Sequence, residues 1–203
     1  MIKKTLKILY KLGIETEVFY GVNGKNISFD GNKLTYQDES YTYDPKVRLN
    51  GKPMTSGEFG CAWSHMSVYK KLLADPKFNN YLVLEDDVDF CENLYNLNDA
   101  ISNLPKKYDV CHIGETVWYP FEHTDPVNET YFNVKKNFFN GAMAYFISKD
   151  GANKLVDNSL SLPADDRLSN AFIGDKISVY APKQRIFQQT RNVRSVIATV
   201  SEN

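Results

Sequence analysis

An uninterrupted apolar run, Tyr81-Leu-Val-Leu84, is followed at once by three carboxylates, Glu85-Asp-Asp87. An apolar run without alternation predicts a parallel strand that is buried on both faces. Apolar residues then recur at helical spacing over residues 94–104, and residues 108–113 are predicted to form a second buried strand. Strand, helix and strand make a βαβ unit, so the chain is predicted to be an α/β protein in which helices flank a mixed, mostly parallel sheet.

The length and the composition favour one compact domain. The chain has 203 residues, of which 42% are hydrophobic and 24% charged, and its formal net charge is -1. A chain of this size buries most of its apolar surface in a single core. We therefore expect one domain over residues 1–203, with a tail from about residue 190. The small net charge provides no field that would attract nucleic acid or an anionic membrane.

The sequence predicts a cytoplasmic protein. No apolar run approaches the roughly 20 residues that a transmembrane helix needs. The first residues are basic, but Lys7 and Lys11 interrupt the apolar stretch that a signal peptide requires. The three cysteines are an odd number and lie within apparently regular elements, so a reducing compartment is favoured over a disulfide framework.

The remaining chain gives a coarse order of elements. An amphipathic helix is predicted over residues 2–12, then a short strand at Glu17–Tyr20, then a long irregular excursion over residues 23–54 with a hairpin near Asp30-Gly31. Thr55 to Glu58 form a capping-box pattern that opens a helix ending near Leu73. Further strands are expected at 142–147, 177–180 and 185–189, and helices at 150–156 and 165–172.

The predicted helix over residues 55–73 carries two residues with chemical potential. Helical spacing places His65 on the inward face, and Gly60, Ser64, Ser67 and Lys71 on the outward face. A histidine on an inward face is more often a hydrogen-bonded core residue than a catalytic one. Cys61 lies one turn earlier on the same buried side, where packing is its simplest role.

The acidic run at the end of the first buried strand is the strongest candidate for a site. Ligands of open α/β sheets bind at the carboxyl ends of strands. Carboxylates this close repel one another unless a cation lies among them, and ligands that offer only oxygen favour Mg²⁺ or Mn²⁺. Glu85, Asp86 and Asp87 are therefore candidate metal ligands. The alternative is a solvated acidic turn.

A second acidic pair, Asp165-Asp166, follows Pro163 at the start of a predicted helix. Taken alone, these carboxylates fit the simpler role of complementing the positive end of the helix dipole.

Taken in order, four blocks of the sequence resemble glycosyltransferase family 25, which includes bacterial lipooligosaccharide galactosyltransferases and collagen galactosyltransferases. The blocks are Gly57-Glu-Phe-Gly-Cys-Ala-Trp-Ser-His65, Leu82-Val-Leu-Glu-Asp-Asp-Val88, Asn140-Gly-Ala-Met-Ala-Tyr-Phe-Ile-Ser148 and Leu162-Pro-Ala-Asp-Asp166. The resemblance spans roughly residues 5–197. The first block is specific to the family, whereas the acidic run alone is not.

The resemblance implies a GT-A fold and inverting transfer of a hexose, galactose first, from a UDP-sugar to a hydroxyl of a glycan or glycoprotein, as in lipopolysaccharide biosynthesis. Glu85, Asp86 and Asp87 match the acidic motif that holds Mn²⁺, or Mg²⁺, against the donor diphosphate. Asp165 or Asp166 would be the base that takes the acceptor proton. The residues implied near the donor or acceptor are Ser64, His65, Asn140 and Gly141. A homo-oligomer is compatible with the resemblance.

The sequence departs from the family pattern at three places, one of which is Ala142, where a Thr is common after the glycine. Family members usually begin with a strand of the type Val-Ile-Asn-Leu, whereas this sequence opens in the helix at residues 2–12, so we expect that upstream residues are omitted here. The late Ser-Asp-Ile of the family is Ser195-Val-Ile197. The missing strand and the missing acid favour an alternative, a degenerate member that binds sugar or a protein without catalysis. A metal-dependent phosphohydrolase also uses clustered acids but leaves the Gly57–His65 block unexplained.

Overall fold

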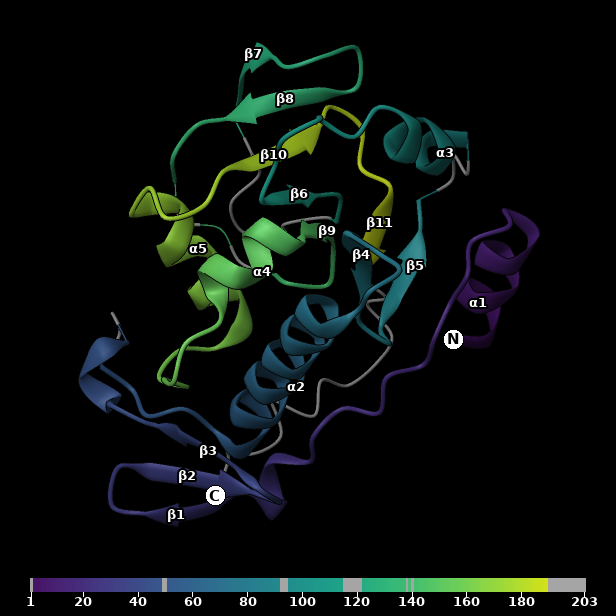
Figure 1. The fold of residues 1–203 in the computed structure, drawn as a ribbon. Coiled ribbons are helices and arrows are strands. Elements are labelled where there is room, and N and C mark those ends of the chain that lie inside the picture. Colours follow the sequence, from purple (N-terminus) through teal and green to yellow (C-terminus); the bar gives the residue numbers. More distant parts are fainter. Residues whose placement is uncertain are drawn as a thin grey trace.

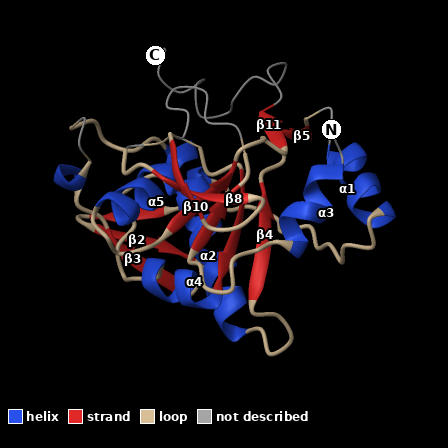
Figure 2. Ribbon diagram, turned by 90° about the horizontal axis from the view of Figure 1, so that it is seen from above, coloured by secondary structure: helices blue, strands red, loops and turns tan. Residues whose placement is uncertain are grey.

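The computed structural model describes residues 2–48, 51–91, 95–114, 122–137, 139 and 141–189. The predicted tail from about residue 190 lies outside these residues, and so do Asn140 and the late Ser195-Val-Ile197. The described chain is mixed α/β, with helices on both faces of a central sheet (Figures 1 and 2). Among the described residues, no helix combines the length and the apolar character needed to cross a membrane.

The central sheet has six strands in the order β4-β9-β6-β10-β8-β7. They are β4 (Asn80–Leu84), β6 (Val110–His112), β7 (His123–Pro126), β8 (Tyr131–Val134), β9 (Ala144–Ser148) and β10 (Val179–Pro182). Only β6 and β10 pair in parallel, and every other neighbouring pair in this sheet is antiparallel. The prediction of a mostly parallel sheet is therefore wrong, although β4 and β6 do run in the same direction.

The reason for this error lies in β9. This strand lies between β4 and β6 and runs against both of them. It is buried on both faces, because Tyr145 and Ile147 enter one core cluster and Ala144 and Phe146 enter the other. Burial on both faces produces an apolar run whatever the direction of the strand, so the apolar pattern could not distinguish the two pairings.

The helices divide between the two faces of the sheet. One cluster packs around α2 (Ser56–Ala74), α4 (Lys149–Leu155) and α5 (Ala164–Ile173). The other cluster involves α1 (Ile2–Lys11) and α3 (Tyr95–Ser102), together with the pair β5 (Val88–Phe90) and β11 (Phe187–Gln189). Figure 2 shows α1 and α3 on the opposite side of the sheet from α2 and α4.

The predicted excursion over residues 23–54 is more regular than expected. It contains a three-stranded antiparallel sheet of β1 (Ser28–Asp30), β2 (Lys33–Tyr36) and β3 (Glu39–Thr42). The hairpin predicted near Asp30-Gly31 is confirmed, and Gly31 has the positive φ of 59° that this turn requires. Short 3₁₀ turns, η1 (Gly24–Asn26) and η2 (Pro45–Val47), flank the sheet.

Helix α2 begins as the sequence predicts. The Thr55 hydroxyl accepts from the N–H of Glu58, and the Glu58 carboxylate accepts from the N–H of Thr55, which completes the capping box. Gly60 is buried rather than outward-facing, because the 22–24 loop packs directly on it. A Cβ at Gly60 would lie 2.4 Å from the carbonyl oxygen of Val22, so this contact requires glycine.

The predicted strand at Glu17–Tyr20 is wrong. Residues 14–23 are extended but form no regular element, and residues 15–21 are exposed. Ion pairs from Glu15 to Lys77 and from Glu17 to Lys71 hold the segment beside α2. An extended segment becomes a strand only when a neighbouring strand pairs with its backbone, and no described strand pairs with Glu17–Tyr20.

One edge of strand β4 has no described partner strand. The N–H of Glu85 donates to Met143 at 2.8 Å, which fixes the alternation of the β4–β9 ladder. The backbone groups of Leu82 and Leu84 therefore point away from β9, and no described strand pairs with that edge. Helix α1 begins nearby, because Thr5 donates to the carbonyl of Val88. A strand that ran along this edge would pair with the backbone groups of Leu82 and Leu84 that point away from β9.

We predict that adding an apolar strand of the Val-Ile-Asn-Leu type ahead of residue 1 raises the melting temperature by several °C. The added strand would pair with the exposed edge of β4 and bury apolar side chains, each contributing about 1.5–3 kcal/mol when fully buried. Differential scanning calorimetry measures the shift, and a polar extension of equal length is the control. Equal melting temperatures for the two extensions would contradict the pairing.

Candidate functional site

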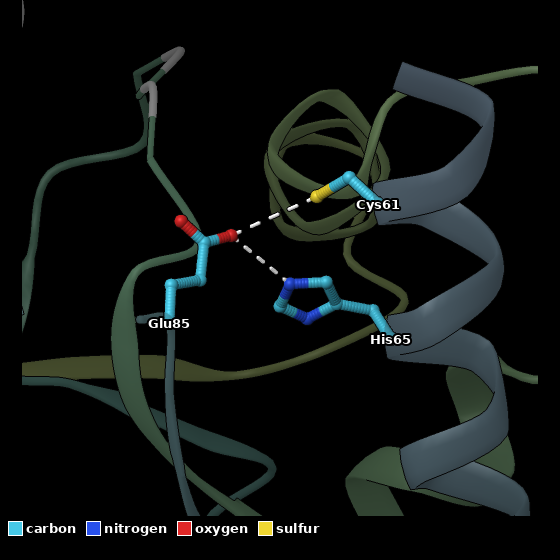
Figure 3. A group of neighbouring side chains, drawn as sticks. All are labelled: Cys61, His65 and Glu85. Carbon is cyan, nitrogen blue, oxygen red and sulfur yellow. Dashed lines mark hydrogen bonds and ion pairs between the residues drawn. The ribbon is translucent and has the colours of Figure 1, made fainter. Parts of the chain in front are cut away.

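The three carboxylates of the acidic run lie in different surroundings. Glu85, directly after β4, turns its side chain toward α2 (Figure 3). Its Oε1 accepts a hydrogen bond from His65 Nε2 at 3.1 Å and lies 3.7 Å from the sulfur of Cys61. Asp86 is exposed to solvent. Asp87 turns toward β11, where its Oδ2 accepts from Gln189 Nε2 at 2.8 Å.

His65 and Glu85 form a partly buried ion pair. The His65 side chain is 7% exposed and that of Glu85 is 30% exposed. Burial alone would lower the pKa of His65, but its interactions with Cys61 and Glu85 raise that pKa well above the usual value. Burial likewise opposes ionisation of Glu85, and the contact with His65 outweighs it and lowers the pKa of Glu85. Both shifts indicate an imidazolium–carboxylate pair.

A chain of buried hydroxyl groups continues from His65 into the core. His65 Nδ1 lies 2.7 Å from the hydroxyl of Tyr145, which in turn lies 2.9 Å from the hydroxyl of Tyr69. Both tyrosines are fully buried. Hydrogen bonds at both ring nitrogens therefore fix the position of the His65 ring.

Asp87 has a carboxylate oxygen without a partner. Its Oδ1 is buried, and none of the described residues donates a hydrogen bond to it. Burial raises the pKa of Asp87, and the nearby charges of Glu85 and Asp86 raise it further against the lowering effect of Gln189. A buried anionic oxygen that lacks a donor, beside an exposed second carboxylate, is a chemical environment that a hard cation satisfies.

Asp165 and Asp166 occupy the first turn of α5 and differ in their contacts. Asp165 accepts from the N–H of Gly141 at 3.3 Å and from the N–H of Asp166 at 3.0 Å. Asp166 Oδ2 lies 3.6 Å from Nε of Arg48. Burial and, next, the charge of Asp165 raise the pKa of Asp166 to about 6, although Arg48 acts in the opposite direction.

The other residues implied by the resemblance have structural partners in this chain. The Ser64 hydroxyl accepts from the N–H of Val22 at 2.8 Å and donates to the carbonyl of Gly60 at 2.6 Å. Gly141 has a φ of 100°, and its carbonyl lies 2.9 Å from Nε2 of His112. Asn140 lies outside the described residues.

Two connections bring the acidic run and the pair on α5 to the same region. The first is the N-terminal half of α2, where Glu58 binds Arg48, the cationic partner of Asp166, and His65 binds Glu85 two turns later. The second is the short segment 141–143: its first residue, Gly141, donates to Asp165, and its last, Met143, accepts from the N–H of Glu85. The site is therefore built from the carboxyl end of β4, the approach to β9 and the starts of α2 and α5.

Sequence reasoning missed several members of this region. Arg48 lies in the predicted excursion, where no periodic pattern distinguished it. Tyr145 and Gln189 were interpreted only as strand residues. Cys61 was assigned to packing, although its spacing of four residues from His65 places both on one face of a helix and was a usable signal.

Comparison with known proteins identifies relatives of this chain. Residues 2–168 match the model of the family described as glycosyltransferase family 25 (LPS biosynthesis protein). Procollagen galactosyltransferase 2 of Homo sapiens is 30% identical over 173 residues, which are 81% of this chain and 27% of that protein. A glycosyltransferase 25 family member of Anopheles gambiae is 27% identical over 184 residues, 83% of this chain and 29% of that protein.

A viral relative also matches. Procollagen lysyl hydroxylase and glycosyltransferase of Acanthamoeba polyphaga mimivirus is 34% identical over 127 residues, 58% of this chain and 14% of that protein. The chain thus spans less than a third of the length of each of these three relatives. The family match covers most of the chain and contains all the acidic residues discussed above. By this match, the chain belongs to glycosyltransferase family 25.

Proposed function

We propose that this protein is a metal-dependent inverting glycosyltransferase that moves a hexose from a UDP-sugar to a hydroxyl group. The observation that carries the proposal is the pairing of two different acidic environments in one region. Asp87 has a buried oxygen without a donor, which suits a cation, and Asp166 has a pKa of about 6, which suits a base. Family membership supports the same reaction class.

Asp87 and Asp86 are the proposed ligands of Mn²⁺ or Mg²⁺. Both offer carboxylate oxygens, and the unpartnered Oδ1 of Asp87 is an atom that such an ion would satisfy. When bound, the metal would neutralise the charge that develops on the nucleoside diphosphate as it leaves. Glu85, already paired with His65, would hold the acidic run in place and would not bind this ion directly.

Asp166 is the proposed general base. Inversion requires a carboxylate that takes the proton from the acceptor hydroxyl as that oxygen attacks the anomeric carbon. A carboxyl group with a pKa of about 6 is ionised at neutral pH and remains basic enough to accept this proton. Asp165 accepts two backbone N–H bonds, which orient the start of α5, so we assign it a positioning role.

The names of the relatives support a choice of donor sugar and acceptor. The names of the human and mouse relatives specify a procollagen galactosyltransferase, and the family description refers to lipopolysaccharide biosynthesis. We therefore propose UDP-galactose as the donor and a glycan or glycoprotein hydroxyl as the acceptor. A second candidate function, sugar binding without transfer, is favoured by the open edge of β4 next to the acidic run.

We predict that UDP-galactose stabilises the protein against heat only when Mn²⁺ is present. A ligand that binds the native state alone contributes about 2.7 kcal/mol at a hundredfold excess over its dissociation constant, or several °C for a chain of this size. Differential scanning fluorimetry with UDP-galactose, UDP-glucose and UDP-N-acetylglucosamine measures this effect, and GDP-mannose is the control. An assay of UDP release and sugar transfer distinguishes an enzyme from a protein that binds sugar without transferring it. No Mn²⁺-dependent stabilisation by any UDP-sugar would contradict the donor assignment.

A further inference from the structure

We infer that Cys61, His65 and Glu85 form a second metal site, of the kind that binds Zn²⁺. Cys61 and His65 lie four residues apart on α2, and Glu85 faces them from the end of β4 (Figure 3). One ligand atom from each residue, namely a sulfur, a ring nitrogen and a carboxylate oxygen, lies within 4.8 Å of the other two. This inference does not depend on the proposed transfer reaction, because it uses a different set of ligand atoms.

The distances are close to those of a bound ion. Zinc lies about 2.0–2.1 Å from nitrogen and oxygen ligands and about 2.3 Å from sulfur, so tetrahedral ligand atoms are separated by roughly 3.3–3.8 Å. Glu85 Oε1 lies 3.1 Å from His65 Nε2 and 3.7 Å from the sulfur of Cys61. Small side-chain rotations would place the three atoms around one ion. A fourth position would remain for water or another ligand, as in zinc sites with three protein ligands.

The surroundings of His65 match those of a metal-binding histidine. Such histidines use their second ring nitrogen in a hydrogen bond that orients the ring. His65 Nδ1 has this bond with the hydroxyl of Tyr145, at 2.7 Å. Tyr145 is itself fully buried and bonded to Tyr69, so the ring that presents Nε2 to Glu85 is held by the core.

The ligand types distinguish this site from the one proposed at Asp86 and Asp87. A thiolate and an imidazole favour zinc and similar transition metals, whereas carboxylates alone favour magnesium and manganese. An ion can reach the site from solvent, because Cys61 is only partly buried and the Glu85 side chain is 30% exposed. Binding would release the thiol proton of Cys61 and the proton shared in the His65–Glu85 pair to solvent.

Cobalt provides a direct test, because Co²⁺ binds such sites and its thiolate complexes absorb in the near ultraviolet. We expect one equivalent of Co²⁺ to produce a thiolate–cobalt absorption band and d–d bands of tetrahedral intensity, and one equivalent of Zn²⁺ to abolish both. Cys61→Ser should abolish the thiolate band, and Glu85→Gln should weaken Co²⁺ binding. Tyr145→Phe should weaken it by about 10–100-fold through loss of the bond that orients His65.

Matched variants separate the two metal sites. Cys91→Ser removes another partly buried cysteine and should leave the spectrum intact. Asp87→Asn should also leave it intact, while removing the Mn²⁺-dependent effect of UDP-sugars. Circular dichroism of the metal-free variants verifies the fold. If Cys61→Ser unfolds, Glu85→Gln serves as the test variant in its place. Absence of the thiolate band in the parent, or a band that persists in Cys61→Ser, would overturn the inference and leave the transfer proposal standing.

Discussion

Replacing Asp166 by asparagine is expected to lower kcat by about 10²- to 10⁴-fold, the usual contribution of a general base. The amide cannot accept the acceptor proton, whereas the donor site is left with all its carboxylates. Affinity for UDP-sugar in Mn²⁺ should therefore change little. Steady-state kinetics with UDP-galactose, together with donor titration by calorimetry, measures the two quantities separately.

The pH profile of the parent gives an independent readout of the same group. Because a base must be deprotonated to act, kcat/KM should rise with pH and level off above about 6, the pKa of Asp166. Asp166→Asn should lose this limb of the profile. Asp165→Asn is the matched control on the same helix turn: it should keep this limb but move it to lower pH, because the charge of Asp165 helps to raise the pKa of Asp166.

Stability shows whether the loss of turnover is a folding defect. The pKa of Asp166 is raised from an ordinary value of 3.8 to about 6, so ionising this group costs stability, and the cost develops as the pH rises from about 4 to about 6. The asparagine variant avoids this cost at neutral pH, up to roughly 3 kcal/mol, a figure that already includes the opposing effect of Arg48. Near-parental turnover in Asp166→Asn would remove this residue from the mechanism.

Local signals in the sequence predicted the helices well. The capping box at Thr55 and the periodic apolar residues of α1 and α3 act within a few residues of one another, so no distant contact is needed to interpret them. The turn at Gly31 was predictable for the same reason. Strand pairing was harder to predict from the sequence. The strand that pairs with β4 is β9, which lies about 60 residues later in the chain.

The candidate site shows the same division. The acidic run and the Asp165-Asp166 pair are visible as consecutive letters, and the resemblance connected them. Their surroundings are set by residues that no local pattern marks: Arg48 beside Asp166, and Gln189 beside Asp87. The turn of Glu85 away from its two neighbours toward His65 also depends on how α2 packs against the end of β4.

Replacing Asp87 by asparagine is expected to abolish the Mn²⁺-dependent stabilisation by UDP-sugars without damaging the fold. The parent should gain about 2.7 kcal/mol at a hundredfold excess of donor over its dissociation constant, and the variant close to none. The amide preserves the volume of the side chain and offers an oxygen to Gln189. It also removes one charge from a run in which Glu85 and Asp86 already oppose ionisation of Asp87.

Asp89→Asn is the matched control for this variant. Asp89 lies two residues further along the chain, within β5, and pairs with Lys4 on α1, outside the acidic run. Its replacement should leave the Mn²⁺-dependent shift unchanged, because its carboxylate already has a cationic partner. Titration of each variant with UDP-galactose at fixed Mn²⁺, followed by the melting temperature, compares the two. If Asp87→Asn kept the full shift while Asp89→Asn lost it, the metal would have to be assigned to the β5–α1 contact instead of the end of β4.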